Sequence, residues 1–430
     1  MMESLGAASH HREARSMTTA TLPPLRDRLG LPQTAGRHRL IGAHLVDSLG
    51  TGLILAFTLV YFARTTSLTL AAIGAAVTTA RLVALPTAIA VGPLIDRYGA
   101  RPVAACGNAL SALAYGGFLL AGQVWQIVLV CLLAQIGHVS YWTSSTGLVV
   151  LASAEGERTR WFALVQTLRN TGMGLGGALG AVLVAGDGTG GLRALVVLNA
   201  ASYAVAAGLL ASWRPAATVP AASAASAGRT ATGERDGGYR AVLRDRRYLL
   251  LVVVHLAFVF GSMIISMLLA VYLTEGLHRE AWLAGSLLVL NGVQVVLTQN
   301  AVARRLERFR PTRVVAAGAL LNALSFGLFA LMAAAPGWIV TAGLFTAMAV
   351  FNLAETVATP YAEELSVSLA DPARRGRYLA VYQLSWNTGQ AVAPALLTLL
   401  LSHGAAWPWL FLLVLSLAAV PGLLRLERLG

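Results

Sequence analysis

Four charged side chains lie inside long apolar stretches of this sequence. They are two acids and two bases: Asp47, Arg81, Arg169 and Glu355. A charge at the centre of a membrane helix costs about 2.5–3.5 kcal/mol, so such residues face a cavity or a partner. Burial favours the neutral form of a carboxyl group, whereas a nearby guanidinium favours its charged form. We therefore expect a proton-coupling relay of these four residues, with Asp47 as the carboxylate that loads and releases the proton.

Each of these residues also has a simpler interpretation. Asp47 and Arg169 could form a fixed structural ion pair, because both are expected at a similar depth in their helices. Arg81 could be a gating partner or an anion contact. Glu355 could belong to a helix that becomes acidic toward its end, since Glu363 and Glu364 follow it.

A second group of side chains combines aromatic rings with polar atoms. His138, Tyr141 and Trp142 follow one another closely in one apolar stretch, and Asn352 and Tyr361 lie in another. Rings with a few polar groups suit an amphiphilic organic ligand. Tryptophan and tyrosine also serve as packing residues or as anchors at the membrane interface. We expect these five residues to contact a substrate in a central cavity, with packing as the alternative.

The elements that must hold these residues are membrane helices. Of the 430 residues, 57% are hydrophobic and 12% are charged, and the mean hydropathy is +0.67. This composition excludes a soluble enzyme, a secreted disulfide-bonded scaffold and a disordered regulator. Each of twelve apolar runs is long enough to span a bilayer. The runs are 39–63, 70–95, 103–122, 124–150, 161–185, 191–212, 248–274, 282–304, 313–334, 337–365, 378–401 and 406–424.

Motifs of enzymes and of metal sites are missing from the sequence. There is no phosphate-binding loop, nucleophile elbow or zinc-binding helix motif. The two cysteines, Cys106 and Cys131, lie inside apolar runs and are expected to be small core residues. We therefore expect neither catalysis, nor a metal site, nor a cofactor.

The basic residues favour one side of the membrane. All 32 are arginine, and the formal net charge is +13. With a cytoplasmic N-terminus, the inner loops and tails hold every arginine except Arg64, Arg81, Arg169, Arg193 and Arg279. This distribution predicts a plasma-membrane protein with both termini in the cytoplasm, and the Ala-, Gly- and Arg-rich composition suggests a bacterial genome of high GC content. Because the charge is spread over all the inner loops, no nucleic-acid partner is expected.

The chain consists of two related halves. His44 and Tyr61 match His255 and Tyr272 at a shift of 211 residues, and Asn-Thr-Gly at 170–172 recurs at a shift of 217. The segment between the halves is rich in Ala, Ser, Gly and Arg, which is typical of a flexible linker. Two parallel six-helix repeats with a site between them form a known transporter plan. The predicted domains are a cytoplasmic tail (1–38), a six-helix bundle (39–212), a cytoplasmic linker (213–247), a second six-helix bundle (248–424) and a cytoplasmic C-terminus (425–430).

The loop after the second apolar run carries the most specific motif. Residues 92–102 read Gly-Pro-Leu-Ile-Asp-Arg-Tyr-Gly-Ala-Arg-Pro. This resembles the signature Gly-x-Leu-x-Asp-Arg-x-Gly-x-Arg-Arg between helices two and three of the major facilitator superfamily. With the twelve runs and the duplicated half, the resemblance covers almost the whole chain. The residues that match the gating motif are Gly92, Asp96, Arg97, Gly99 and Arg101.

The resemblance implies a fold and roles for several residues. It implies an all-α integral membrane protein with twelve transmembrane helices, whose helices one, four, seven and ten line the cavity. It implies that Asp96 meets the N-terminus of helix eleven, near Arg377, and latches the outward-open state. Arg97 and Arg101 could pair across the loop and bind lipid phosphates, or could only set the topology.

Helix five shows a further pattern. Gly172, Gly176 and Gly180 repeat every four residues, which gives a smooth face for close helix packing. Proton antiporters of the superfamily have a Gly-rich motif at this place, with a Gly-Pro step that this sequence lacks.

These features together predict a secondary transporter that works by alternating access. The resemblance to proton-driven exporters implies export of a small amphiphilic drug or metabolite, by antiport with protons. The expected partners are that substrate, protons and the lipid bilayer, and we expect a monomer. One alternative is a proton-coupled uptake symporter for a small organic solute, in which Arg81 and Arg169 bind an organic anion. Another is a non-transporting membrane sensor or lipid scramblase.

Overall fold

The computed structural model describes residues 30–55, 57–154, 156–215, 238–280 and 282–429. Within these ranges the chain is helical and contains no strand. Most of the expected N-terminal tail and most of the expected linker lie outside the described residues, so the predicted domain limits stay a prediction.

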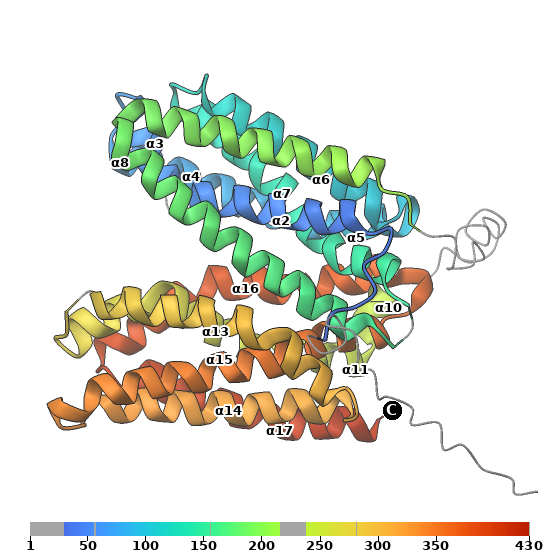
Figure 1. Cartoon of the computed structure of the whole chain (residues 1–430), viewed down its shortest axis with the longest axis vertical. Coiled ribbons are helices and arrows are strands. Elements are labelled where there is room, and N and C mark those ends of the chain that lie inside the picture. Colours follow the sequence, from blue (N-terminus) through green and yellow to red (C-terminus); the bar gives the residue numbers. More distant parts are fainter. Residues whose placement is uncertain (1–29, 56, 155, 216–237, 281, 430) are drawn as a thin grey trace, which may run out of the picture.

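The first half of the chain forms one layer of helices (Figure 1). Its helices are α2 (His38–Leu55), α3 (Thr58–Thr65), α4 (Leu70–Ala84), α5 (Thr87–Tyr98), α6 (Ala100–Phe118), α7 (Val124–Ala152) and α8 (Arg158–Ser212). The bend of 43° between α4 and α5 lies at Pro86, which has no backbone N–H to continue the helix. In α8, a Cβ at Gly191 would lie 1.9 Å from the carbonyl oxygen of Leu183. In a straight helix eight residues span about 12 Å, so α8 turns back on itself here.

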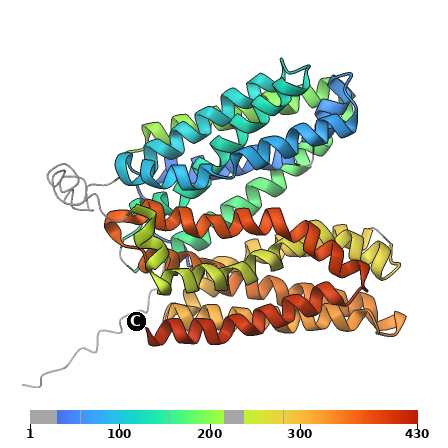
Figure 2. The ribbon, with the colours of Figure 1, turned by 180° about the vertical axis from the view of Figure 1, so that it is seen from behind.

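The second half forms the other layer, and the view from behind shows the same division (Figure 2). Its α-helices are α10 (Gly238–Arg244), α11 (Arg246–Met263), α12 (Leu269–Val271), α13 (Trp282–Leu306), α14 (Pro311–Met332), α15 (Gly337–Ser368), α16 (Arg375–Ser402) and α17 (Trp407–Arg428). Two π-helical turns, η1 (Ile264–Leu268) and η2 (Tyr272–Gly276), continue α11, and a 3-10 turn, η3 (Pro372–Arg374), precedes α16.

Each half has its own apolar core. In the second half, Phe329 stacks on Trp409 with ring centres 4.2 Å apart. In the first half, Phe62 and Phe118 lie 4.8 Å apart. The halves meet through α5, α7 and α8 on one side and α13, α15 and α16 on the other. A site between the halves is therefore built from residues far apart in the sequence.

Seven helices of the described chain are long and apolar enough to cross a membrane, or nine if each bent pair counts as one span. Helix α6, the first part of α8 and helix α16 are not among these apolar helices. In α8 and α16 the reason is polarity, because Gln166, Arg169, Gln383 and Gln390 face a cavity between the halves. An all-α membrane fold is thus confirmed, while the number of twelve spans stays a prediction.

One end of the molecule, which we call the basic end, carries the C-terminal ends of α5, α7, α8, α13 and α17 (Figure 1). Arginine contacts tie these helix ends together: Arg101 Nη1 donates to the carbonyl of Trp213 at 2.5 Å. The positive-inside pattern predicts that this end faces the cytoplasm.

Candidate functional site

The two halves touch closely at the basic end. Asp96, at the end of α5, accepts a hydrogen bond from the backbone N–H of Gly376 at 2.6 Å, and its other oxygen lies 3.3 Å from Arg377 Nη1. A carboxylate at a helix N-terminus is stabilised by the free N–H groups and the helix dipole. A Cβ at Gly376 would lie 2.3 Å from the carbonyl oxygen of Gly92. Only glycine therefore allows this approach of α16 to α5.

A second contact of the same kind joins α8 to the second half. Arg160 binds Glu307 with two hydrogen bonds, of which Nη2–Oε2 is 2.6 Å. Glu307 follows Asp96 by 211 residues, and Arg377 follows Arg160 by 217, which are the two shifts of the internal repeat. Two pairs in equivalent places of the two halves therefore help to close the basic end, beside the longer Arg158–Glu364 ion pair across the halves at 3.9 Å.

A third contact comes from the helix that follows the linker. Pro93, inside α5, has no N–H to give to the carbonyl of Ile89 four residues before it. The Tyr239 hydroxyl, from α10, donates a hydrogen bond to this carbonyl. It reaches the carbonyl over Gly92, where a Cβ would lie 2.4 Å from the Tyr239 oxygen.

Behind this closed end lies a cavity between the halves, in three adjoining chambers. The deep chamber measures about 40 Å³, the middle chamber about 190 Å³ and the wide chamber about 410 Å³. Trp142, Arg169 and Trp386 line both the deep and the middle chamber. Asn387 and Gln390 line both the middle and the wide one. The cavity therefore widens with distance from the basic end.

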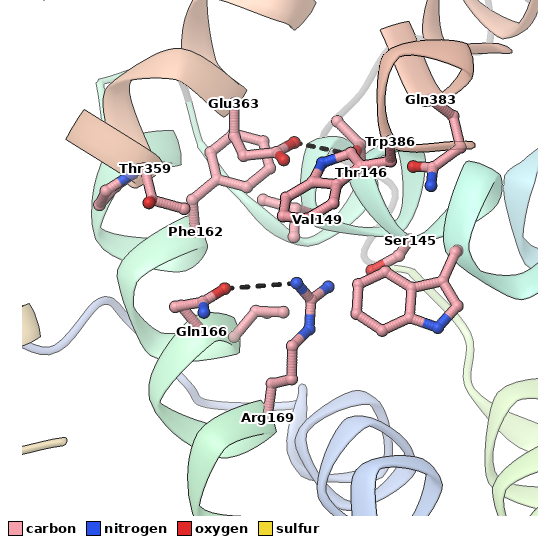
Figure 3. A pocket seen from close by; sticks show the side chains of 13 residues that line it. Ser145, Thr146, Val149, Phe162, Gln166, Arg169, Thr359, Glu363, Gln383 and Trp386 are labelled. Carbon is pink, nitrogen blue, oxygen red and sulfur yellow. Dashed lines mark hydrogen bonds between the residues drawn. The ribbon is translucent and has the colours of Figure 1, made fainter. Parts of the chain in front are cut away.

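Arg169 is at the centre of the deep chamber (Figure 3). Its guanidinium carbon lies 3.6 Å from the ring centre of Trp142, a cation–π contact. Its Nη1 donates to Gln166 Oε1 at 3.3 Å. Across the chamber, Glu363 of α15 accepts a hydrogen bond from Thr146 Oγ1 at 3.1 Å. Arg169 points toward Glu363, which is its principal acidic neighbour.

Asp47, within the first half, is a second acidic neighbour of Arg169. Its side chain is only 2% exposed, and Arg169 and Asn108 act on its carboxyl group. No ion pair joins Asp47 to Arg169 among the residues that the structure describes. The fixed structural pair that the sequence allowed is therefore not present. Arg169 instead lies between a carboxylate of each half.

Two other predicted residues line the cavity. His138 faces the middle chamber, where its ring lies 5.5 Å from that of Trp142. Arg81 faces the wide chamber.

The structure corrects the expectation for four residues, which do not line these three chambers. The Tyr141 hydroxyl is bonded to His44 Nδ1 at 2.7 Å. Tyr361 donates to the carbonyl of Ala303 at 2.6 Å. Asn352 accepts from Asn291 at 2.6 Å, and Glu355 lies beside the same Asn291. Their polar groups are used for packing inside each half: Tyr141 joins α7 to α2, and the other three lie on the face of α15 that packs against α13.

The remaining predicted residues have structural contacts. Arg97 lies 5.2 Å from the ring of Tyr98, and Arg101 binds the Trp213 carbonyl. Gly99 has a φ of +87°, which glycine adopts without strain. Helix α8 presents its glycines to α2: a Cβ at Gly172, Gly176 or Gly180 would lie 2.8, 2.1 or 3.0 Å from an α2 carbonyl oxygen.

Sequence analysis missed part of the cavity wall. From the sequence we place Glu363 only at the acidic end of its helix, and we assign no residue of α16 to the cavity wall. Yet Trp386, Asn387 and Gln390 follow Gln383 by three, four and seven residues, a spacing that places all four on one face of a helix. A polar stripe in an apolar run is the signal that could have identified them.

Comparison with known proteins agrees with this architecture. The family model described as Major Facilitator Superfamily matches residues 40–360 and 284–428. The multidrug resistance protein MdtH of Photorhabdus laumondii is 26% identical over 360 residues, covering 84% of this chain and 85% of that protein. A Na(+), Li(+), K(+)/H(+) antiporter of Planococcus maritimus is 26% identical over 362 residues, covering 78% and 82%.

Solved structures share the fold at lower identity. The human organic anion transporter MFSD10 aligns with a TM-score of 0.68 at 16% identity, over 94% of this chain and 100% of that one. The proton:xylose symporter XylE aligns with a TM-score of 0.71 at 15% identity, over 90% and 94%. The family match extends over nearly all of the chain, and the protein belongs to the major facilitator superfamily.

Proposed function

We propose that this membrane transporter is a proton-coupled exporter of a small amphiphilic drug or metabolite. The observation that carries the proposal is the position of Arg169. From the first half it faces the cavity, with Asp47 in its own half and Glu363 in the other half. Protonation of either carboxyl group changes its attraction to Arg169, and so does a movement of the halves. Proton binding and the movement of the halves therefore both change the electrostatic interactions of Arg169.

Alternating access would use the contacts at the basic end. In the predicted orientation this end is cytoplasmic, so the described conformation faces outward. Opening toward the cytoplasm must break the bonds of Asp96 to Gly376 and of Arg160 to Glu307. It must also part Glu363 from Thr146 and Arg169 of the other half. A proton on Glu363 would reduce the electrostatic cost of that separation.

The relatives support this direction of transport. A multidrug resistance protein and a cation/proton antiporter are each 26% identical to the chain over most of its length. The name of the first relative supports a drug as the substrate, and the name of the second supports exchange against protons.

The test is expression in an efflux-deficient bacterium, with measured accumulation of lipophilic dyes and antibiotics. Wild type should lower accumulation, and Asp47→Asn or a protonophore should each abolish this effect. Membrane levels and detergent gel filtration would verify that Asp47→Asn is folded. Continued energy-dependent efflux by Asp47→Asn would remove Asp47 from the coupling role.

A second candidate is proton-coupled uptake of an organic solute. It is favoured by Arg81 and Arg169 in the cavity wall, because an anion on Arg169 would favour protonation of the neighbouring carboxyl groups. Proton and anion would then bind together, as symport requires. Proteoliposomes with an inward proton gradient distinguish the two: a symporter accumulates the solute inside, whereas an exporter of the same orientation does not.

A further inference from the structure

Among the residues that the structure describes, the middle and wide chambers of the cavity have basic but no acidic lining side chains. Their lining includes Arg81, Arg169 and His138. Glu363 lines only the deep chamber, and Asp47 is almost completely buried within the first half. A lipophilic cation in these two chambers would meet like charges without a carboxylate to bind.

Most N–H donors of Arg169 have no hydrogen-bond partner among the described residues. A guanidinium has five N–H donors, and in the part of the chain that the structure describes, Arg169 uses one, toward Gln166. Stacking on Trp142 holds its plane and leaves its edge free. A fixed guanidinium edge matches the two oxygens of a carboxylate or of a sulfonate-like group.

Arg81 and two tryptophans add to this arrangement. Arg81 faces the wide chamber and has no hydrogen bond or ion pair among the described residues. Trp142 of α7 and Trp386 of α16 both line the middle chamber, so an aromatic body can contact a large apolar surface from each half. Gln135 and Gln390 supply neutral hydrogen-bonding groups in the same wall.

We propose that the substrate is an organic anion with an aromatic body. Arg169 binds its negatively charged group, the rings of Trp142 and Trp386 bind its body, and Arg81 attracts it at the wide mouth. This inference rests on the proposed transport function, in either direction, and specifies the substrate class. Its negative charge separates it from the cationic dyes that many exporters are tested with.

The test uses two probes with the same xanthene ring system and opposite charge, carboxyfluorescein and rhodamine 123. Binding to purified protein in nanodiscs is followed by quenching of tryptophan fluorescence, and transport is followed in proteoliposomes. We expect saturable binding of carboxyfluorescein, weakened at least tenfold by Arg169→Gln and several-fold by Arg81→Gln. The control Arg64→Gln, an exposed arginine that does not line the cavity, should leave binding within twofold of wild type. Arg81→Gln removes no hydrogen bond or ion pair among the described residues, so it remains a valid test if Arg169→Gln is unstable.

The outcomes separate this inference from the proposed function. Binding of rhodamine but not of carboxyfluorescein, or binding of neither probe by folded protein, would contradict the proposal that the substrate is an organic anion. Transport of rhodamine would then still support export. Arginine-dependent binding of carboxyfluorescein without any transport would support an organic anion as the ligand and contradict the proposed transport function.

Discussion

Arg169 is the residue that joins the two carboxyl groups of the site. A guanidinium does not lose its proton in a protein, so the proposed coupling assigns proton uptake to Asp47 and Glu363. Asp47 moves with Arg169 because both belong to the first half. Glu363 belongs to the second half, so its distance from Arg169 depends on the conformation. We therefore expect that protonation of Glu363 weakens its attraction to Arg169 and so makes it easier for the halves to separate.

Glu363→Gln tests this role of the second carboxyl group. The amide can still accept from Thr146 Oγ1, but it cannot take up a proton. We expect gradient-driven transport to fall by at least tenfold while substrate exchange without a gradient continues, both measured in proteoliposomes. Glu364→Gln is the matched control, because Glu364 pairs with Arg158 at 3.9 Å and does not line the cavity. Equal losses of gradient-driven transport in both variants would mean that Glu363 holds the two halves together and does not couple transport to protons.

At the level of elements, close approach of helices decides how the cavity is shaped. Helix α8 packs on α2 through glycines, and α5 meets α16 where Gly92 and Gly376 leave room for backbone contact. Bulk at these positions would displace whole helices, because the facing atoms are backbone atoms that cannot rotate away.

The glycine face of α8 gives a prediction about stability. Gly176→Ala places a methyl group 2.1 Å from the carbonyl oxygen of Leu49, and overpacking of this kind costs about 1–3 kcal/mol. The melting temperature in detergent should therefore fall by several degrees. Gly174→Ala, two residues away, meets no atom within 4 Å and should not lower it. A Gly176→Ala protein as stable as Gly174→Ala would contradict the close α2–α8 approach.

The Pro93–Tyr239 contact gives a prediction about the gate. Tyr239→Phe removes the hydrogen bond to the Ile89 carbonyl, a contact worth about 0.5–1.5 kcal/mol, so it should favour opening at the basic end. A single cysteine at Thr146, with Cys106 and Cys131 replaced by serine, would report opening as faster maleimide labelling.

A double-mutant cycle isolates this hydrogen bond. Pro93→Ala restores a backbone N–H that can bond the Ile89 carbonyl, so Tyr239→Phe should change labelling much less in that background. Equal effects of Tyr239→Phe in both backgrounds would show that the tyrosine acts in another way.

At the level of the whole molecule, the repeat produces two equivalent closures. Asp96 with Arg377, and Glu307 with Arg160, join the halves at the basic end. The pairs differ in detail, since Asp96 also accepts from a backbone N–H, whereas Glu307 binds the arginine with two bonds. Both must separate in the same movement.

Removing the two pairs should therefore favour the same opening. Asp96→Asn and Glu307→Gln should each increase labelling of the Thr146 cysteine, by roughly tenfold for a charged hydrogen bond of about 1.5–3 kcal/mol. The double variant should be labelled faster than either single variant. Glu427→Gln is the control, because Glu427 pairs with Arg310 and Arg313 inside the second half. If Glu307→Gln has no effect on labelling, only the first pair closes the gate.

The sequence by itself determined the class of fold and the family. Long apolar runs must form helices in a bilayer, where every backbone polar group needs an internal partner, and the motif at 92–102 is specific enough to indicate the superfamily. It also singled out Asp47, Arg169 and Asp96, because a charge in or at the edge of the membrane is costly and therefore rarely incidental.

Only the tertiary structure decided which polar residues face the cavity. Glu355 and Asn352 are used between α13 and α15, while Glu363, two turns further on, faces Arg169. One helix exposes different faces along its length, and the neighbour on each face depends on how the halves pack. The sequence of a single helix cannot show which face meets the cavity, because Arg169 and Glu363 approach each other from opposite halves of the chain.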